Sequence, residues 1–149
     1  MQRPDRNAQD GFTLIEIMVV VLVIGLLIAI ALPTFLGARS RAQDRGVQTD
    51  VRNAFLAERT FYTDGATYTE SILLLDAIEP ALDYVVGDTP VATGSVYVHV
   101  HPVPNELFVS GRSVSGTCFY LREIDGGGAE FASSTGCGVA DTQTFSPTW

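Results

Sequence analysis

The feature that most constrains this chain is a long apolar run that begins at Phe12 and ends at Leu36. A helix of that length extends over roughly 37 Å at 1.5 Å per residue, which is enough to cross a bilayer core of about 30 Å with some tilt. The run is too long for an ordinary secretory signal, and no small-residue cleavage site follows it. We therefore expect residues 12–36 to form a helix that stays in a membrane or in a packed bundle of helices.

One acid, Glu16, interrupts this apolar run. An ionisable side chain inside a membrane-length segment is costly, so it is a functional hypothesis by default. Glu16 lies one helical turn beyond Phe12. If the chain were cut before Phe12, the new α-amino group would have a pKa near ~8, and Glu16 of a neighbouring copy could pair with it.

The residues around Glu16 form a motif, Gly11-Phe12-Thr13-Leu14-Ile15-Glu16, followed by Ile17-Met18-Val19-Val20-Val21. This motif closely resembles the class III signal peptide of type IV pilins and type II secretion pseudopilins. The resemblance is specific over residues 10–35 and only architectural over the rest of the chain.

The resemblance implies a processing site and a mode of assembly. In that family a membrane aspartyl peptidase, the prepilin peptidase, cuts after the glycine and methylates the new N-terminus. This implies cleavage between Gly11 and Phe12 and N-methylation of Phe12. Gly25 and Pro33 match positions where such pilins carry residues that weaken the helix. The resemblance also implies that the helices of many copies bundle into a filament, in which Glu16 of one copy neutralises the Phe12 amine of another.

Beyond the apolar run, the pattern becomes that of an amphipathic helix. Apolar side chains recur at steps of three and four residues: Val47, Val51, Ala54, Phe55, Phe61 and Tyr62. Asp64-Gly65 is a good stop, because Gly suits the left-handed conformation that often ends a helix. The two parts together predict one helix of about 50 residues, whose second half packs on a head domain.

The C-terminal part predicts a small sheet. Residues 66–95 are expected to be a connecting region, in which Thr69 caps a short helix that runs to about Leu75 or Ile78. Alternating apolar residues then predict four strands, over residues 96–101, 106–110, 117–124 and 129–132. Strands linked as hairpins imply an antiparallel sheet.

The predicted fold class is therefore α+β, similar to that of type IV pilins: a long N-terminal helix packed on a small antiparallel sheet of about four strands. The expected layout is a cleaved leader over residues 1–11, a transmembrane or filament-core helix over 12–36, an amphipathic helix over 37–64 and a globular head over 65–149.

The net charge of −8 at pH 7 is unevenly placed. Residues 39–59 carry five Arg against three acids, whereas the residues beyond them carry two Arg against eleven acids. An acidic head argues against nucleic acid as its partner, although the charge can also serve solubility alone. The chain has no lysine to act as the nucleophile of an isopeptide bond, so any fibre that it builds is expected to be non-covalent.

Cys118 and Cys137 are the two cysteines of the chain. A pair in a small exported domain predicts a disulfide, with two free thiols or half of a metal site as the alternatives. A disulfide here would close a loop of about 20 residues and stabilise the head by roughly 3 kcal/mol. In related pilins such a C-terminal disulfide loop covalently fixes an exposed edge of the head. The terminal aromatic residue, Trp149, is expected to pack back onto the sheet, with an adhesive role as the alternative.

Few residues point to chemistry. His99 and His101 are expected on one strand face, where they could begin a metal site with Glu106 or Glu123, but a solvated polar face is the simpler interpretation. The sequence has no nucleophile-elbow motif and no lysine for a phosphate-binding loop. We therefore expect no catalytic residue, no metal and no cofactor, and a protein that is not an enzyme.

The leading hypothesis is a structural pilin of a type IV pilus. Its expected partners are further copies in a helical filament, the prepilin peptidase, the pilus or secretion assembly machinery, and the membrane. The expected location is the cytoplasmic membrane, spanned once with the head outside, and then the extracellular pilus. Counting Arg residues alone slightly favours the opposite orientation. The alternatives are a type II secretion pseudopilin or minor pilin, and a monomeric, membrane-anchored extracellular binding domain.

Overall fold

The computed structural model describes residues 11–102 and 105–149, so all of the leader predicted over residues 1–11 except Gly11 lies outside the described residues. The chain divides between Ala38 and Arg39 into two units. The helix α1, Leu14–Gly65, is continuous over 52 residues, beginning in the first unit and ending in the second. It confirms the single long helix that the apolar run and the amphipathic pattern predict.

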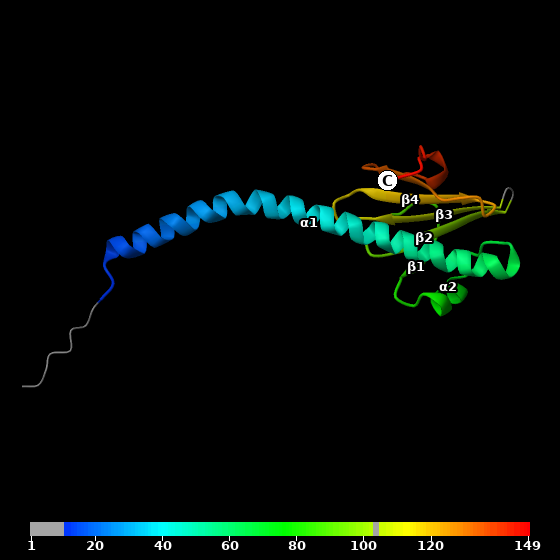
Figure 1. Ribbon diagram of the computed structural model, residues 1–149, viewed down its shortest axis with the longest axis horizontal. Helices are drawn as coiled ribbons and strands as arrows, with labels where there is room; N and C mark the ends of the chain where they lie inside the picture. The colour runs from blue at the N-terminus through cyan, green and yellow to red at the C-terminus, as the bar shows by residue number, and fades with distance from the viewer. Residues whose placement is uncertain (1–10, 103–104) are drawn as a thin grey trace, which may run out of the picture. The chain divides into compact units, whose positions relative to one another are not determined.

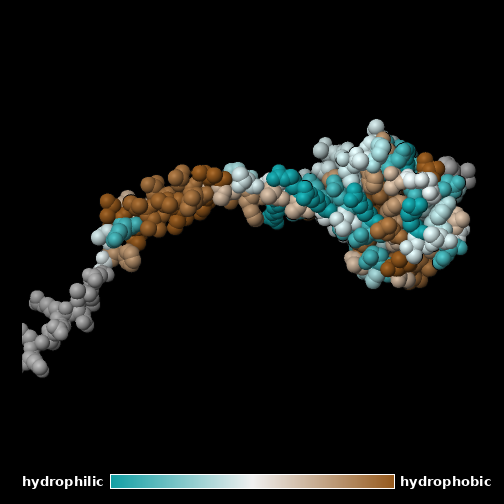
Figure 2. Space-filling model, in the orientation of Figure 1, coloured by the Kyte–Doolittle hydropathy of each residue, from teal (hydrophilic) through white to brown (hydrophobic). Residues whose placement is uncertain are grey.

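In the first unit, the side chains of α1 are exposed among the residues that the structure describes. Every residue from Gly11 to Leu36 is solvent-exposed, and Figure 2 shows a nearly continuous hydrophobic surface over this segment. Removing such apolar surface from water is worth about 25 cal/mol per Å². The segment therefore requires lipid or other helices around it.

The end of α1 differs in one detail from the sequence-based expectation. The left-handed residue is Ala66, with φ of 53°, and not Gly65. The N–H of Ala66 still donates to the carbonyl of Tyr62 at 2.7 Å, so helical hydrogen bonding continues through Gly65 and the chain turns one residue later. A left-handed conformation costs a residue with a side chain roughly 1–2 kcal/mol.

The short helix α2, Ile72–Ile78, ends where the sequence suggests, but its N-cap is Ser71 and not Thr69. The Ser71 side chain makes no capping hydrogen bond. The hydroxyl of Thr69 instead accepts the N–H of Ser71 at 3.1 Å, which fixes the turn just before the helix. The capping prediction was wrong because this local side-chain bond competes with a helix cap.

The second unit contains a five-stranded sheet in the order β1-β2-β3-β4-β5 (Figure 1). The strands are β1, Tyr84–Val86; β2, Val96–Pro102; β3, Asn105–Arg112; β4, Cys118–Ile124; and β5, Glu130–Ser134. The pairs from β2 to β5 are antiparallel hairpin neighbours, as expected. The predicted α+β class, with a long N-terminal helix packed on a small sheet, is confirmed.

The sheet is mixed, however, because the unpredicted strand β1 pairs with β2 in parallel. β1 has only three residues, too few to show an alternating pattern, and it lies within the stretch expected to be a connecting region. A turn and loop over residues 87–95 bring the chain back to the same edge, so the parallel pair arises without a crossover helix.

One face of the sheet packs on α1. The buried side chains of the helix are mostly apolar and meet alternate residues of the strands: Val51, Ala54, Phe55 and Ala57 from α1, and Val96, Val98, Leu107, Val109 and Leu121 from the sheet. Gly111 of β3 lies close to the helix. A Cβ added there would stand 2.9 Å from Cγ1 of Val47 and 3.3 Å from Cγ2 of Val51. The predicted packing of Val51 and Phe55 on the sheet is confirmed.

The opposite face of the sheet is covered by the C-terminal segment, which is red in Figure 1. Phe108, Tyr120 and Ala132 from the strands pack there with Ala140 and Phe145. The chain end returns to the other cluster: the Trp149 ring lies 5.2 Å from the Phe119 ring and 5.0 Å from the Phe131 ring, between centroids. The prediction that Trp149 packs back onto the sheet is confirmed.

Candidate assembly site

The first candidate site is the N-terminal turn of α1. The backbone N–H and the hydroxyl of Thr13 both donate to Oε2 of Glu16, at 2.9 and 2.7 Å. The N–H of Glu16 donates in return to the Thr13 hydroxyl at 3.3 Å. This reciprocal arrangement is a capping box, in which a Thr and a Glu three residues later satisfy the free N–H groups of a helix start.

The capping box gives Glu16 a partner inside its own chain. The Thr-x-x-Glu spacing was the available signal for it, and the sequence-based reasoning, which considered only a partner on another copy, missed it. Phe12 and Glu16 also line one shallow depression on the helix surface with Ile15, Val19 and Val20. Phe12 is 84% exposed, so this side of the helix presents an acid and an aromatic residue side by side.

The two candidate weak points of the helix lie inside a continuous α1. Gly25 is exposed, and a Cβ added to it would meet nothing within 4 Å. Pro33 is also inside the helix. Neither residue ends α1, so their predicted role in loosening the helix during assembly stays a prediction. By length and composition, α1 is able to cross a membrane.

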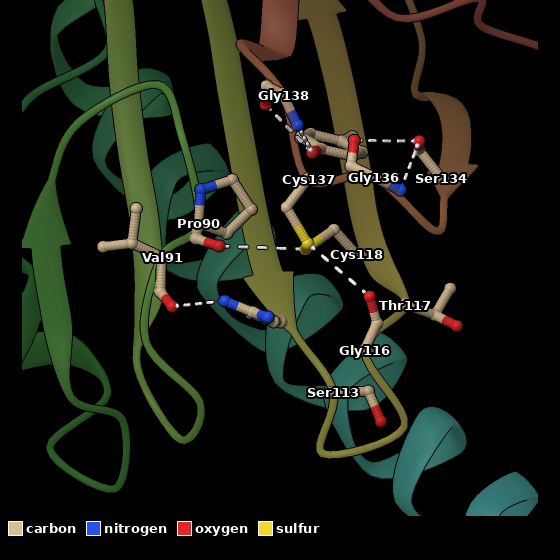
Figure 3. The surroundings of a disulfide bond; sticks show 12 residues. Pro90, Val91, Ser113, Gly116, Thr117, Cys118, Ser134, Gly136, Cys137 and Gly138 are labelled. Carbon is tan, nitrogen blue, oxygen red and sulfur yellow. Dashed lines mark hydrogen bonds between the residues drawn. A yellow bond between two sulfur atoms is a disulfide. The ribbon is translucent and has the colours of Figure 1, made fainter.

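Cys118 of β4 and Cys137 form a disulfide, with 5.4 Å between their Cα atoms (Figure 3). Tyr120 holds the same segment, since its hydroxyl donates to the carbonyl of Gly138 at 3.0 Å and accepts the N–H of Gly138 at 3.1 Å. Ser134 closes the turn just before Cys137, because its hydroxyl accepts the N–H of Gly136 at 3.2 Å. The C-terminal segment is thereby fixed to the face of the sheet that α1 does not cover.

The two histidines lie next to each other on the sheet. His99 and His101 share a strand face, with 4.7 Å between ring centroids. Nδ1 of His99 lies 2.9 Å from Oε1 of Glu70, while Glu106 pairs with Arg122 at 3.7 Å. Over residues 11–102 and 105–149, no three His, Cys, Asp or Glu side chains are grouped so that they could hold a metal ion.

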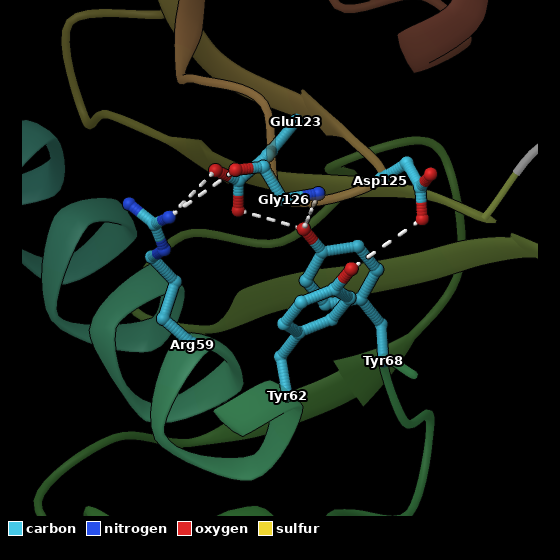
Figure 4. A network of polar contacts seen from close by, with 6 residues as sticks. All are labelled: Arg59, Tyr62, Tyr68, Glu123, Asp125 and Gly126. Carbon is cyan, nitrogen blue, oxygen red and sulfur yellow. Dashed lines mark hydrogen bonds and ion pairs between the residues drawn. The ribbon is translucent and has the colours of Figure 1, made fainter. Parts of the chain in front are cut away.

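Glu123, the other acid considered beside the histidines, lies on the opposite face of the sheet, in a polar network (Figure 4). Its Oε2 accepts the Tyr68 hydroxyl at 2.7 Å, and its Oε1 lies 3.4 Å from Nη2 of Arg59. The Tyr68 hydroxyl also accepts the N–H of Gly126 at 3.2 Å. Burial, together with the bond to Glu123, raises the pKa of Tyr68. The network ties the last turns of α1 to the turn between β4 and β5.

A second buried acid, Glu58 of α1, holds the loop between α1 and α2. It is 0% exposed, and its Oε2 accepts the N–H of Thr69 at 3.1 Å. Burial raises the pKa of Glu58 to about 7, the Thr69 N–H opposes this, and the nearby charge of Glu70 adds to it. Sequence reasoning missed Glu58, although its position three residues after Phe55 places it on the buried side of the helix.

With this geometry established, comparison with known proteins defines the class of the chain. Residues 6–32 match the family model described as the prokaryotic N-terminal methylation motif. The class that this match defines is that of proteins carrying the N-terminal methylation motif, which here lies at the start of the long helix α1.

Several relatives indicate a more specific class of protein. The chain is 37% identical over 60 residues to the type IV major pilin protein PilA of Myxococcus xanthus, covering 40% of this chain and 27% of the relative. It is 38% identical over 66 residues to the type IV wide pilus major component PilA4 of Thermus thermophilus, covering 44% and 50%. It is 34% identical over 107 residues to the type IV major fimbrial protein FimA of Dichelobacter nodosus, covering 66% and 65%.

The chain spans less than two thirds of the length of each of these relatives. The motif, the fold and these relatives support a relationship to the type IV pilin family.

Proposed function

We propose that this chain is a structural subunit of a type IV pilus, polymerised non-covalently through its N-terminal helix. The observation that carries the proposal is the combination of a fully exposed apolar helix with a head that has its own core. A soluble monomer would leave that helix in water, whereas a membrane covers it before assembly and other copies cover it afterwards.

Processing comes first in the proposed sequence of events. The prepilin peptidase cuts between Gly11 and Phe12 and methylates the Phe12 amine. The anchor is retained, because the cut precedes the apolar run. Before assembly the subunit spans the cytoplasmic membrane once with its head outside, where the oxidising environment favours the Cys118–Cys137 disulfide. The assembled subunit belongs to the extracellular pilus.

Glu16 then directs assembly. Burying an unpaired carboxylate in an apolar bundle costs several kcal/mol, and the capping box satisfies only part of its hydrogen-bonding capacity because both Thr13 donors share Oε2. The Phe12 amine of a neighbouring copy supplies the compensating positive charge. Gly25 and Pro33 let the helix loosen locally as it passes from lipid into the bundle.

The partners in this proposal are further copies of the chain, the prepilin peptidase, the assembly machinery and the membrane. The chain acts as a structural element without a catalytic centre or cofactor, and its acidic head repels nucleic acid.

The proposal is tested by replacing Glu16. Glu16→Ala should leave normal amounts of subunit in the membrane and abolish its recovery in sheared filaments. The matched control is Thr13→Val, which removes the hydroxyl of the capping box but keeps the acid, and should still give filaments. Normal filaments from Glu16→Ala would refute the pairing. A chain that is only a trace component of sheared filaments would instead be a minor pilin or pseudopilin, and one that stays a monomer would be a tethered binding domain.

A further inference from the structure

The part of α1 in the head carries a row of arginines on one side. Arg41, Arg45, Arg52 and Arg59 follow one another at steps of four and seven residues, which places them within about 40° of each other around the helix axis. Arg52 stacks on the Phe131 ring at 5.5 Å, which places this side of the helix beside β5, an outer strand of the sheet. Arg41, Arg45 and Arg52 are called the basic flank below.

Two arginines of the basic flank have no ion-pair partner within the described part of the chain. Arg41 and Arg45 are exposed, and neither makes an ion pair with any residue in the described part of the chain. The β3–β4 loop is tied to the helix here, because the Ser115 hydroxyl donates to Asp44, the neighbour of Arg45. Exposed Val114 precedes Ser115 in that loop. This flank therefore offers unpaired positive charge next to some apolar surface.

The flank beside the other outer strand, β1, is apolar and acidic where the first flank is basic. α2 packs beside β1 and buries Leu75 alone among its residues. Leu73 is 79% exposed, and Leu74, Ile78 and the α1 residue Leu56 are exposed as well. Figure 2 shows hydrophobic surface where Figure 1 draws α2, and a shallow groove separates the two helices, lined by Asn53, Leu56, Ala57, Thr60, Ile78 and Glu79.

The same flank is negatively charged. Neither Asp76 nor Glu79 makes an ion pair within residues 11–102 and 105–149. The pKa of the neighbouring Tyr84 is raised to about 12, first by burial and then by the charges of Glu79, Glu58 and Asp76. Negative charge is thus concentrated here without compensation. Leu56, Leu73, Leu74, Ile78, Asp76 and Glu79 are called the acidic flank.

We propose that the acidic flank of one copy docks on the basic flank of the next copy. The inference rests on the proposed function and names the surface through which neighbouring heads meet. Asp76 and Glu79 face Arg41 and Arg45 of the neighbour, while the exposed leucines pack on the arginine stems and on Val114.

The arrangement of the two flanks favours a second copy over a different partner. Both flanks occur on every head, at the two outer strands of one sheet, and they are complementary to each other. A contact between two different surfaces of the same molecule is heterologous, so it repeats head to tail and builds a ring or an open helix. Like charges would keep two acidic flanks, or two basic flanks, apart.

Charge reversal tests the proposal. Glu79→Arg and Arg45→Glu should each lower the yield of sheared filaments by about tenfold or more, since a contact weakened by 1.4 kcal/mol is tenfold weaker, while the amount of membrane-inserted subunit stays normal. The double variant should recover filaments. Asp141→Arg, an exposed acid outside both flanks, is the matched control and should assemble normally. Single variants that assemble normally, or a double variant no better than either single one, would overturn the proposal.

Chemical cross-linking gives a second readout that does not depend on yield. The chain has no free cysteine, so Leu73→Cys and Val114→Cys introduce the only reactive thiols. In filaments of the double variant, a short bismaleimide should produce a ladder of dimers, trimers and higher species, whereas either single variant should produce none. Filaments that give no ladder would contradict the docking, while failure of the unaltered chain to form filaments would overturn the proposed function itself.

Discussion

Glu58 makes the stability of the head depend on pH in a direction opposite to that of most acids. Its pKa rises from 4.5 to about 7 on folding. Between these values the folded protein holds a proton that the unfolded chain has lost, so stability falls as the pH rises from 4.5 to 7. Below pH 4.5 both states are protonated and Glu58 contributes no pH dependence. Above pH 7 its penalty is complete, at about 3 kcal/mol for this shift at 1.36 kcal/mol per pKa unit.

Glu58→Gln should remove this penalty. The amide oxygen can still accept the N–H of Thr69, and the side chain fills the same volume without a charge. We expect the variant to be up to about 3 kcal/mol more stable than the unaltered chain at pH 8 and nearly equal to it at pH 4. The difference between the two free energies of unfolding should grow over the window from 4.5 to 7.

The assay is urea unfolding of the full chain in detergent micelles, followed at several pH values through the fluorescence of Trp149. This residue is the single tryptophan of the chain and packs against Phe119 and Phe131, so its signal reports the head. Asp141→Asn, which removes an exposed charge, is the control and should follow the unaltered chain. A Glu58→Gln variant whose stability runs parallel to that of the unaltered chain from pH 4 to 8 would refute the reasoning.

Three further predictions concern the head. Replacing both Cys118 and Cys137 with Ser should lower the free energy of unfolding by roughly 3 kcal/mol, because the disulfide closes a loop over a separation of 19 residues; a loss below 1 kcal/mol, measured by urea unfolding, would contradict this. Gly111→Ala should destabilise the head by about 1–3 kcal/mol, since the new Cβ would meet Val47 at 2.9 Å. Gly116→Ala is the comparison: Gly116 has φ of 91° and no atom within 4 Å of the new Cβ, so this variant measures the cost of backbone strain without a clash. Tyr68→Phe should cost about 1–3 kcal/mol by leaving Glu123 and the Gly126 N–H without the hydroxyl, and unchanged thermal unfolding would show that the network adds nothing.

The sequence predicts the elements of this fold that have a long, regular pattern. The continuous α1 follows from the apolar run and the three- and four-residue spacing behind it, and β2 follows from the alternation of Val96, Val98 and Val100. β1 was missed because three residues are too few to show an alternating pattern. The Ala66 turn and the Ser71 cap depend on individual hydrogen bonds, which outweigh the residue preferences that favoured Gly65 and Thr69.

At the candidate site, the sequence shows where Phe12 and Glu16 lie but not how their contacts are made. Thr13 satisfies part of the hydrogen-bonding capacity of Glu16 within one chain, and this local bond follows from the spacing of the two residues. The buried positions of Glu58 and Glu123 depend on tertiary partners, Thr69 and Tyr68, which lie 11 and 55 residues away. The spacing of apolar residues indicates a buried face, but it does not show that an acid on that face will find a donor.

The central claim is that a newly freed Phe12 amine meets Glu16 of a neighbouring copy, and this requires the chain to be cut after Gly11. The most direct measurement is the intact mass of the protein from sheared filaments, compared with that of Gly11→Asp extracted from the membrane. The account predicts a filament polypeptide that begins at Phe12 and carries one methyl group and a disulfide, and an uncut Gly11→Asp chain. A filament subunit that still retains Gly11 or any residue before it would contradict the claim.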